Sequence, residues 1–279
     1  MNKWKRIKGV DREVLRDTRK TLHQTVQIVS AFPRHLLPHD PTDGTASLEW
    51  NPEDKALQSI PVPNSHDLEM RSGLSFKDFL LTIKYADMSC DKFHILGKSV
   101  NAGMDWLKRE LKKMAFASES LTLDLPYEIE SYDNAASLMV NKRACKEYAR
   151  LYGNTFQALS ELVDNFPEAH DIRCWPHHFD LATLIPVGTD DKGEITKSIG
   201  VGLSPGDEGV EEPYLYVNVW PDIELEVLQQ HVLPAGRWNT EGWSGAVLTY
   251  TELLNSSDQA DIFTQFIEMA VAALQKEST

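Results

Sequence analysis

The sequence of 279 residues contains few cysteines, no excess of basic residues and no long apolar run. Cys90, Cys145 and Cys174 are odd in number and far apart, so we expect reduced thiols rather than a disulfide or a zinc knuckle. No run of about 18 apolar residues is present, and the basic start MNKWKRIKGV lacks the apolar core of a secretory signal. These absences predict a cytoplasmic protein.

Positive charge is also scarce, because 42 acidic residues outnumber 28 basic ones and give a formal net charge of −14. The average field of such a chain repels phosphate backbones and anionic lipid. We therefore expect neither a nucleic acid nor a membrane as partner. A small molecule remains the partner class to consider, and the oligomeric state stays open.

The common catalytic signatures are missing as well. The sequence has no G-x-S-x-G elbow, no GxxxxGK[ST] phosphate loop and no H-E-x-x-H pair. The glycines of SIGVGLSPGDEG lie inside a predicted strand rather than at a strand-to-helix turn, so they do not form a dinucleotide fingerprint. The sequence does not decide whether the protein is an enzyme.

What the chain does contain is alternating helical and strand patterns. Helical spacing of apolar residues predicts helices over residues 11–37, 99–116, 134–166 and 258–276. Residues 120–129 alternate like a strand, residues 76–85 fit either a helix or a strand, and residues 40–71 read as a hairpin or an extended crossing.

Three further strand-like segments, 174–187, 195–204 and 213–220, are joined by short turn-rich connectors. Short connectors of this kind favour an antiparallel meander. The expected class is α+β, with the meander in the C-terminal half, flanking helices, and either one sheet or two sheets around a long central helix. The chain is expected to be a single compact protein, or two subdomains covering residues 1–130 and 131–279.

The two faces of this meander differ in kind. Odd-numbered positions are mostly apolar and should cover the core, whereas even-numbered positions are polar, aromatic or glycine. We estimate the register of the three segments from the first loop, which should pair residue 188 with residue 194. This register places residue 180 of the first segment near 202 of the second, and residue 216 of the third segment near 200 of the second. Gly200 and Gly202 would then form the floor of a trough that could hold a small polar or aromatic ligand. One side of the trough would carry His178, Asp180 and Ser204, and the other would carry Tyr214, Tyr216, Asn218 and Trp220.

The stretch RCWPHHFD also permits a metal site. His178 and Asp180 would share one strand face near the loop SPGDEGVEEP, while His177 would point to the core. A divalent cation could be held by His178, Asp180 and a loop carboxylate such as Asp207, with Glu208, Glu211 or Glu212 as substitutes.

The glycines permit a further alternative. Glycines on one face of a central strand also let a helix pack closely, and the predicted helix over residues 258–276 is a candidate. The protein would then be a structural or interaction protein whose even face is covered by its own helix.

Several short motifs resemble an uncharacterised bacterial family, a domain of unknown function. They are Leu22-His23 followed by Gln27-Ile28-Val29, FDLA at 179–182, PGDE at 205–208 and EPYLYV at 212–217. The resemblance extends from about residue 18 to residue 254. It implies kinship and a bacterial cytoplasmic setting, and it implies no activity, substrate or cofactor.

Overall fold

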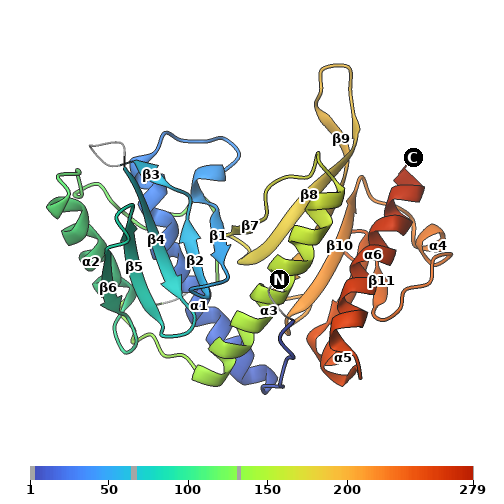
Figure 1. The fold of residues 1–279 in the computed structure, drawn as a ribbon, viewed down its shortest axis with the longest axis horizontal. Helices are drawn as coiled ribbons and strands as arrows, with labels where there is room; N and C mark the ends of the chain where they lie inside the picture. The colour runs from blue at the N-terminus through green and yellow to red at the C-terminus, as the bar shows by residue number, and fades with distance from the viewer. Residues whose placement is uncertain (1–3, 64–67, 131–132, 279) are drawn as a thin grey trace. The chain divides into compact units, whose positions relative to one another are not determined.

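The computed structural model describes residues 4–63, 68–130 and 133–278 (Figure 1). The chain divides into two compact units. The N-terminal unit consists of Glu13–Ala149 and Arg173–Phe179, and the C-terminal unit consists of Met1–Arg12, Arg150–Ile172 and Asp180–Thr279. Each unit combines helices with antiparallel strands, which confirms the α+β class.

The strands of the N-terminal unit run antiparallel in the order β7-β1-β2-β4-β5-β6, and β3 pairs with β4. Their bounds are Leu48–Asn51 (β1), Ala56–Ser59 (β2), Val62–Pro63 (β3), Glu69–Ser75 (β4), Leu80–Tyr85 (β5), Cys90–His94 (β6) and Arg173–Trp175 (β7). The ambiguous segment 76–85 therefore contains a strand. Leu81 and Ile83 are buried in β5 while their neighbours are partly exposed, as expected for a strand with one face on the core.

The helices of this unit are α1 (Arg12–Leu36), α2 (Val100–Lys113), the short 3₁₀ helix η1 (Gly44–Ala46) and the first part of α3 (Lys142–Asn165). The predictions over 11–37 and 99–116 are confirmed. Helix α1 lies behind β2 and β4 in Figure 1, and its Val29 carbonyl accepts a 2.8 Å hydrogen bond from Ser72 Oγ on β4. Helix α3 begins later than residue 134, because the Asn141 side chain accepts from the amides of Arg143 and Ala144 and so caps the helix there.

Residues 121–130 belong to no strand and bend at residues 126, 127 and 130, so the strand predicted over 120–129 is wrong. The alternation is still real, because odd-numbered residues of this stretch are buried or partly buried and even-numbered residues are exposed. We call residues 120–130 the strap. Tyr127 of the strap donates a 2.7 Å hydrogen bond to Gln27 Oε1 on α1. The apolar period of two therefore reflects packing of an extended chain on a helix, without a hydrogen-bonded ladder.

The strands of the C-terminal unit run antiparallel in the order β8-β9-β10-β12-β11. Their bounds are Asp180–Thr189 (β8), Ile195–Ser204 (β9), Tyr214–Trp220 (β10), Arg237–Asn239 (β11) and Gly245–Thr249 (β12). The helices are the remainder of α3, α4 (Leu225–Leu228), α5 (Tyr250–Asn255) and α6 (Gln259–Ser278). The predicted meander and the predicted C-terminal helix are both confirmed. None of the helices in the described part of the chain has the length and apolar content needed to cross a membrane.

The odd-numbered face of the meander is the core face of this unit. Eight of its apolar side chains are at most 4% exposed; they are Leu181, Ile185, Ile199, Val201, Leu203, Leu215, Val217 and Val219. Helix α6 contacts β9, β10 and β12, and its Ser278 carbonyl accepts a 2.5 Å hydrogen bond from Lys197, an odd-numbered residue of β9. Burying each of these side chains contributes about 1.5–3 kcal/mol. Helix α6 therefore packs on the odd face, while the glycines belong to the even face.

Two details of the meander differ from the sequence prediction. The segment 174–187 is not one strand, because Trp175 O accepts from the amides of His178 and Phe179 and closes a turn between β7 and β8. Phe179 in this turn has a φ of 58°. The alternation of faces in β8 therefore does not extend back through residues 174–179. The predicted faces of His177 and His178 are wrong for this reason.

The register is also shifted by two residues on both sides of β9. Ala182 and Tyr216 lie opposite Gly202, and Leu184 and Asn218 lie opposite Gly200. The first hairpin is closed by the pair Asp190 and Glu194, whose backbone atoms bond at 2.9 Å, rather than by 188 and 194. Since the shift is an even number, residues 180–186, 198–204 and 214–220 keep their predicted faces. A bulge between Pro186 and Thr189 places Gly188 opposite Lys197, so the alternation breaks there.

Candidate functional site

The predicted ligand residues on the even face of β8, β9 and β10 form pairs with one another. Tyr216 Oη donates a 2.5 Å hydrogen bond to Asp180 Oδ2, and Asp180 is 8% exposed. Tyr214 Oη donates to Asp207 Oδ2, and burial together with this carboxylate raises the pKa of Tyr214. Ser204 Oγ accepts from the amide of Gly206 at 3.2 Å. Much of the hydrogen-bonding capacity of this face is therefore used within the fold.

The predicted glycine floor is occupied by side chains of the same sheet. A Cβ added to Gly202 would lie 2.7 Å from Tyr216 Oη and 2.8 Å from the Leu181 carbonyl oxygen. A Cβ added to Gly200 would lie 2.2 Å from Asn218 Oδ1. Glycine at both positions makes room for side chains of the strand β10, and no atom of α6 is among these nearest contacts.

Trp220 is the exception on this face, because 57% of its surface is exposed. It lies opposite Ser198 at the end of β10. Asn218, two residues earlier, is partly exposed, although its Oδ1 is buried and has no hydrogen-bond partner among the described residues. The indole of Trp220 is therefore the group that opens this end of the even face to solvent.

The residues proposed for a cation face solvent or accept other hydrogen bonds. His178 is exposed, Asp180 accepts from Tyr216, and Asp207 accepts from Tyr214. Within residues 4–63, 68–130 and 133–278, no three His, Cys, Asp or Glu side chains are grouped so that they could hold a metal ion. Glu212 of the same loop accepts from the Thr251 amide at 3.1 Å and pairs with Arg12 at 3.3 Å, so it caps α5 instead.

The turn that carries the two histidines is fastened to α1. His23 Nε2 lies 2.8 Å from the Pro176 carbonyl oxygen, and Gln27 Nε2 donates to the same oxygen at 2.7 Å. A carbonyl only accepts, so His23 carries its proton on Nε2. Burial lowers the pKa of His23 to about 4, and its ring stacks on Phe179 at 5.4 Å. His23, Gln27 and Phe179, which belong to three of the short motifs, therefore lie around one turn.

His177 does not reach the core as expected. It is half-buried between aromatic rings, with its centroid 5.5 Å from that of Tyr127 and 4.3 Å from that of His178. Burial lowers the pKa of His177, and the nearby Asp43 carboxylate partly opposes this shift. Its aromatic neighbour Tyr127 connects the histidine turn to the strap and to α1.

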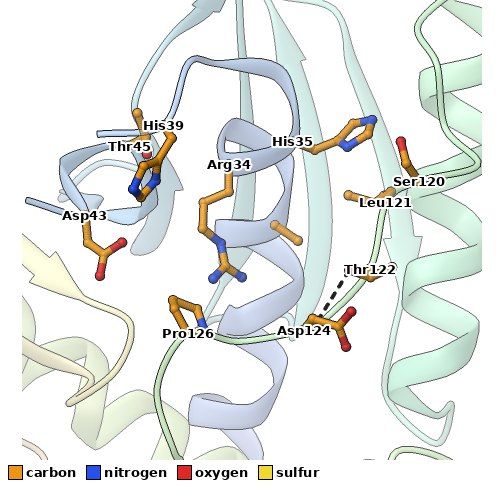
Figure 2. A pocket seen from close by; sticks show the side chains of 11 residues that line it. Arg34, His35, His39, Asp43, Thr45, Ser120, Leu121, Thr122, Asp124 and Pro126 are labelled. Carbon is orange, nitrogen blue, oxygen red and sulfur yellow. Dashed lines mark hydrogen bonds between the residues drawn. The ribbon is translucent and has the colours of Figure 1, made fainter. Parts of the chain in front are cut away.

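A pocket of about 290 Å³ lies next to this cluster, within the N-terminal unit (Figure 2). Three segments that are distant in sequence supply its mostly polar lining: the end of α1, the chain from residue 39 to 45, and the strap. The lining residues are Ala31, Arg34, His35, His39, Asp43, Thr45, Ser120, Leu121, Thr122, Asp124 and Pro126. The Arg34 side chain extends into the middle of the group in Figure 2.

Arg34 is held against the strap by an aromatic ring. Its guanidinium carbon lies 5.9 Å from the centroid of Tyr127, a distance at which the ring face attracts the cation. His35 turns toward the opposite wall, where its Nε2 lies 2.6 Å from the Ala117 carbonyl oxygen. The pocket thus contains a permanent cation whose orientation is set by Tyr127.

Sequence reasoning missed this pocket because its residues carry no common spacing. FPRHLLPHD supplies Arg34, His35 and His39, and it lies at the end of the helix predicted over residues 11–37. Helix α1 ends at Leu36, close to that predicted end. The signal available in the sequence was the basic Arg34-His35 pair at the end of the helix, and the facing strap could not be inferred from it.

Comparison with known proteins identifies a family for this chain but no activity. No curated protein and no solved structure matches the chain. A family model described as a family of unknown function, DUF5996, matches residues 9–278. The resemblance seen in the short motifs is therefore confirmed, and the chain belongs to this family of unknown function.

Proposed function

We propose that this protein binds a small polar ligand and that the pocket of Figure 2 is its site. The observation that carries the proposal is the convergence of polar side chains from three distant segments on one cavity. Binding sites in proteins are typically concave and use a few converging polar groups to orient the ligand. A volume of about 290 Å³ suits a molecule of metabolite size.

The location of the pocket supports a binding role rather than a role in stability. Its strap residues Ser120, Thr122 and Asp124 are exposed. Thr122 Oγ1 accepts a 3.4 Å hydrogen bond from the Asp124 amide within the strap, whereas the odd-numbered strap residues are buried or partly buried. The strap therefore presents exposed polar groups to the pocket, while its odd-numbered residues supply the burial.

A thermal-shift screen with amino acids, hydroxy acids, sugars and phosphate tests the proposal. A compound that binds the folded state alone raises the free energy of unfolding by about 2.7 kcal/mol at one hundred times its dissociation constant. Thr122→Trp fills the pocket from an exposed position and should abolish the stabilisation. Glu128→Trp is the matched control, since Glu128 is an exposed strap residue outside the pocket.

Two results would contradict the pocket as the site. One is stabilisation that survives Thr122→Trp, and the other is equal loss in Thr122→Trp and Glu128→Trp. Either result would mean that the compound binds elsewhere or that any bulky residue on the strap disturbs the fold.

The even face of the meander is a second candidate, favoured by the exposed indole of Trp220 beside Asn218. A planar ligand could stack on this ring while the Asn218 side chain makes a polar contact. Quenching of tryptophan fluorescence by a purine or an indole compound, lost in Trp220→Leu, would support this site. Quenching that is unchanged in Trp220→Leu would count against it.

We propose a bacterial cytoplasm as the setting of this activity. The bacterial part rests on the family resemblance. Three free cysteines in the described structure support the cytoplasmic part, because secreted proteins more often use their cysteines in disulfides.

A further inference from the structure

We propose that the pocket in the N-terminal unit recognises an oxyanion, a carboxylate or phosphate group on a small molecule, through Arg34. This inference rests on the proposed function and names the class of ligand. It follows from the charge, the surroundings and the orientation of one side chain.

Arg34 is a cation that has no acidic partner among the described residues. Two carboxylates, Asp43 and Asp124, line the same pocket, yet Arg34 forms no ion pair and no hydrogen bond with either of them in the part of the chain that the structure describes. In Figure 2 the carboxylates of Asp43 and Asp124 lie on opposite sides of the Arg34 guanidinium. In a chain with a net charge of −14, an arginine left unpaired beside two carboxylates is a notable arrangement.

The surroundings of Arg34 hold it ready for such a group. The Tyr127 ring lies against the guanidinium, and the Tyr127 hydroxyl is itself anchored to Gln27 at 2.7 Å. Gln27 is 2% exposed and also holds the Pro176 carbonyl, so this chain of contacts begins in the core. A guanidinium stacked on a ring keeps its N–H groups at its edge, where they can donate in pairs to a carboxylate or a phosphate.

The position of Arg34 in α1 accounts for part of its presence but not for its orientation. Basic residues are favoured in the last turn of a helix, where they offset the negative end of the helix dipole. A guanidinium directed to solvent would interact with the helix dipole equally well. The contact with Tyr127 places it in the pocket instead, whose lining also includes the hydroxyl groups of Thr45, Ser120 and Thr122, which can donate to other oxygens of the ligand.

The experiment uses inorganic phosphate and succinate as probes, with sodium chloride at matched ionic strength as the reference. Each anion should raise the melting temperature of the wild type saturably, beyond the effect of chloride. Arg34→Gln should weaken binding of the preferred anion about 10- to 100-fold, the contribution of a charge-assisted hydrogen-bonded pair. Arg109→Gln is the control, because Arg109 is exposed on α2 of the same unit and does not line the pocket.

The two probes distinguish the source of the oxyanion. If a carboxylate is recognised, succinate binds more tightly than phosphate, and Arg34→Lys loses affinity because an ammonium cannot donate through a planar fork. If a phosphate is recognised, the order is reversed and Arg34→Lys retains most of the affinity, since lysine binds phosphate as a point charge. Arg34→Lys also serves as the test if Arg34→Gln does not fold.

Three results would overturn the inference: no saturable shift with either anion, equal binding by wild type and Arg34→Gln, or equal loss in Arg109→Gln. A neutral compound that stabilises the wild type and is blocked by Thr122→Trp, while both anions fail, would overturn the inference alone. The proposed function would stand in that case. Failure of every compound in the thermal-shift screen would count against both.

Discussion

The even face of the meander and the pocket beside α1 are both rich in polar side chains, but they use them differently. On the meander, acidic residues of β8 and of the β9–β10 loop accept from tyrosines of β10, as in the pairs Asp180–Tyr216 and Asp207–Tyr214. In the pocket, Arg34 lies near acidic groups without pairing with them. Polar residues concentrated on a strand face thus stabilise the sheet, whereas polar residues brought together from distant segments leave donors available for a ligand.

The largest expected effect tests how tightly the meander face is filled. Gly202→Ala should lower the free energy of unfolding by about 3 kcal/mol, because the added Cβ would overlap a backbone carbonyl and the Ala182 Cβ as well as the Tyr216 hydroxyl. Gly200→Ala should cost less than about 1 kcal/mol, since only the end of the Asn218 side chain must move. Urea denaturation measures both, and equal costs would mean that the face is not packed as described.

The next effect compares a paired group with an unpaired one. Tyr216→Phe removes the donor to the buried Asp180 carboxylate and should cost about 2 kcal/mol, the range for a hydrogen bond to a charged group. Arg34→Gln removes a partly exposed cation that pairs with no carboxylate in the described ranges and should cost about 0.5 kcal/mol. If the two variants lose the same stability in urea, the distinction between the two regions is lost.

A pH titration tests the contact that fastens the histidine turn to α1. The pKa of His23 is lowered from 6.5 to about 4, so its contribution to stability is complete above pH 6.5 and is lost as pH falls toward 4. The unfolded chain binds the proton first, and the loss should reach about 2 kcal/mol for this partly enclosed ring. His23→Gln should show a shallower decline over this window in parallel urea titrations. A decline as steep as that of the wild type would show that other groups cause it.

The smallest effect concerns the adjacent histidines. His177→Ala should cost about 1 kcal/mol, because its ring is half-buried against Tyr127 and Trp175. His178→Ala should stay within about 0.5 kcal/mol of the wild type, since this side chain is exposed. Thermal denaturation of the two variants is sufficient, and the opposite order would contradict the turn geometry.

The sequence was informative about elements and faces and weak on register and on sites. Alternation in β9 and β10 was read correctly because one face is buried and a shift of two residues preserves it. The turn at Pro176–Phe179 was missed because apolar and polar residues continue to alternate through WPHHFD, as they do in a strand. The backbone leaves the strand conformation there, and Phe179 takes a positive φ. The strap shows the same limit, since its period of two is satisfied by a helix surface rather than by a neighbouring strand.

The pocket could not be predicted for a different reason. Arg34 and Thr122 are far apart in the chain, and nothing in the spacing of either residue indicates the other. Their juxtaposition depends on the strap crossing α1, which is set by the buried Leu121 and by the Tyr127–Gln27 hydrogen bond. Site residues that converge through tertiary packing leave no local pattern to read.

Hydrogen–deuterium exchange with a compound that raises the melting temperature compares the two regions in one measurement. Binding in the pocket predicts slower exchange in peptides that cover residues 34–47 and 118–126, with unchanged exchange in peptides from β9 and β10. Thr122→Trp should remove that protection. Protection confined to residues 198–204 and 214–220 would place the ligand on the meander face and would contradict the central claim.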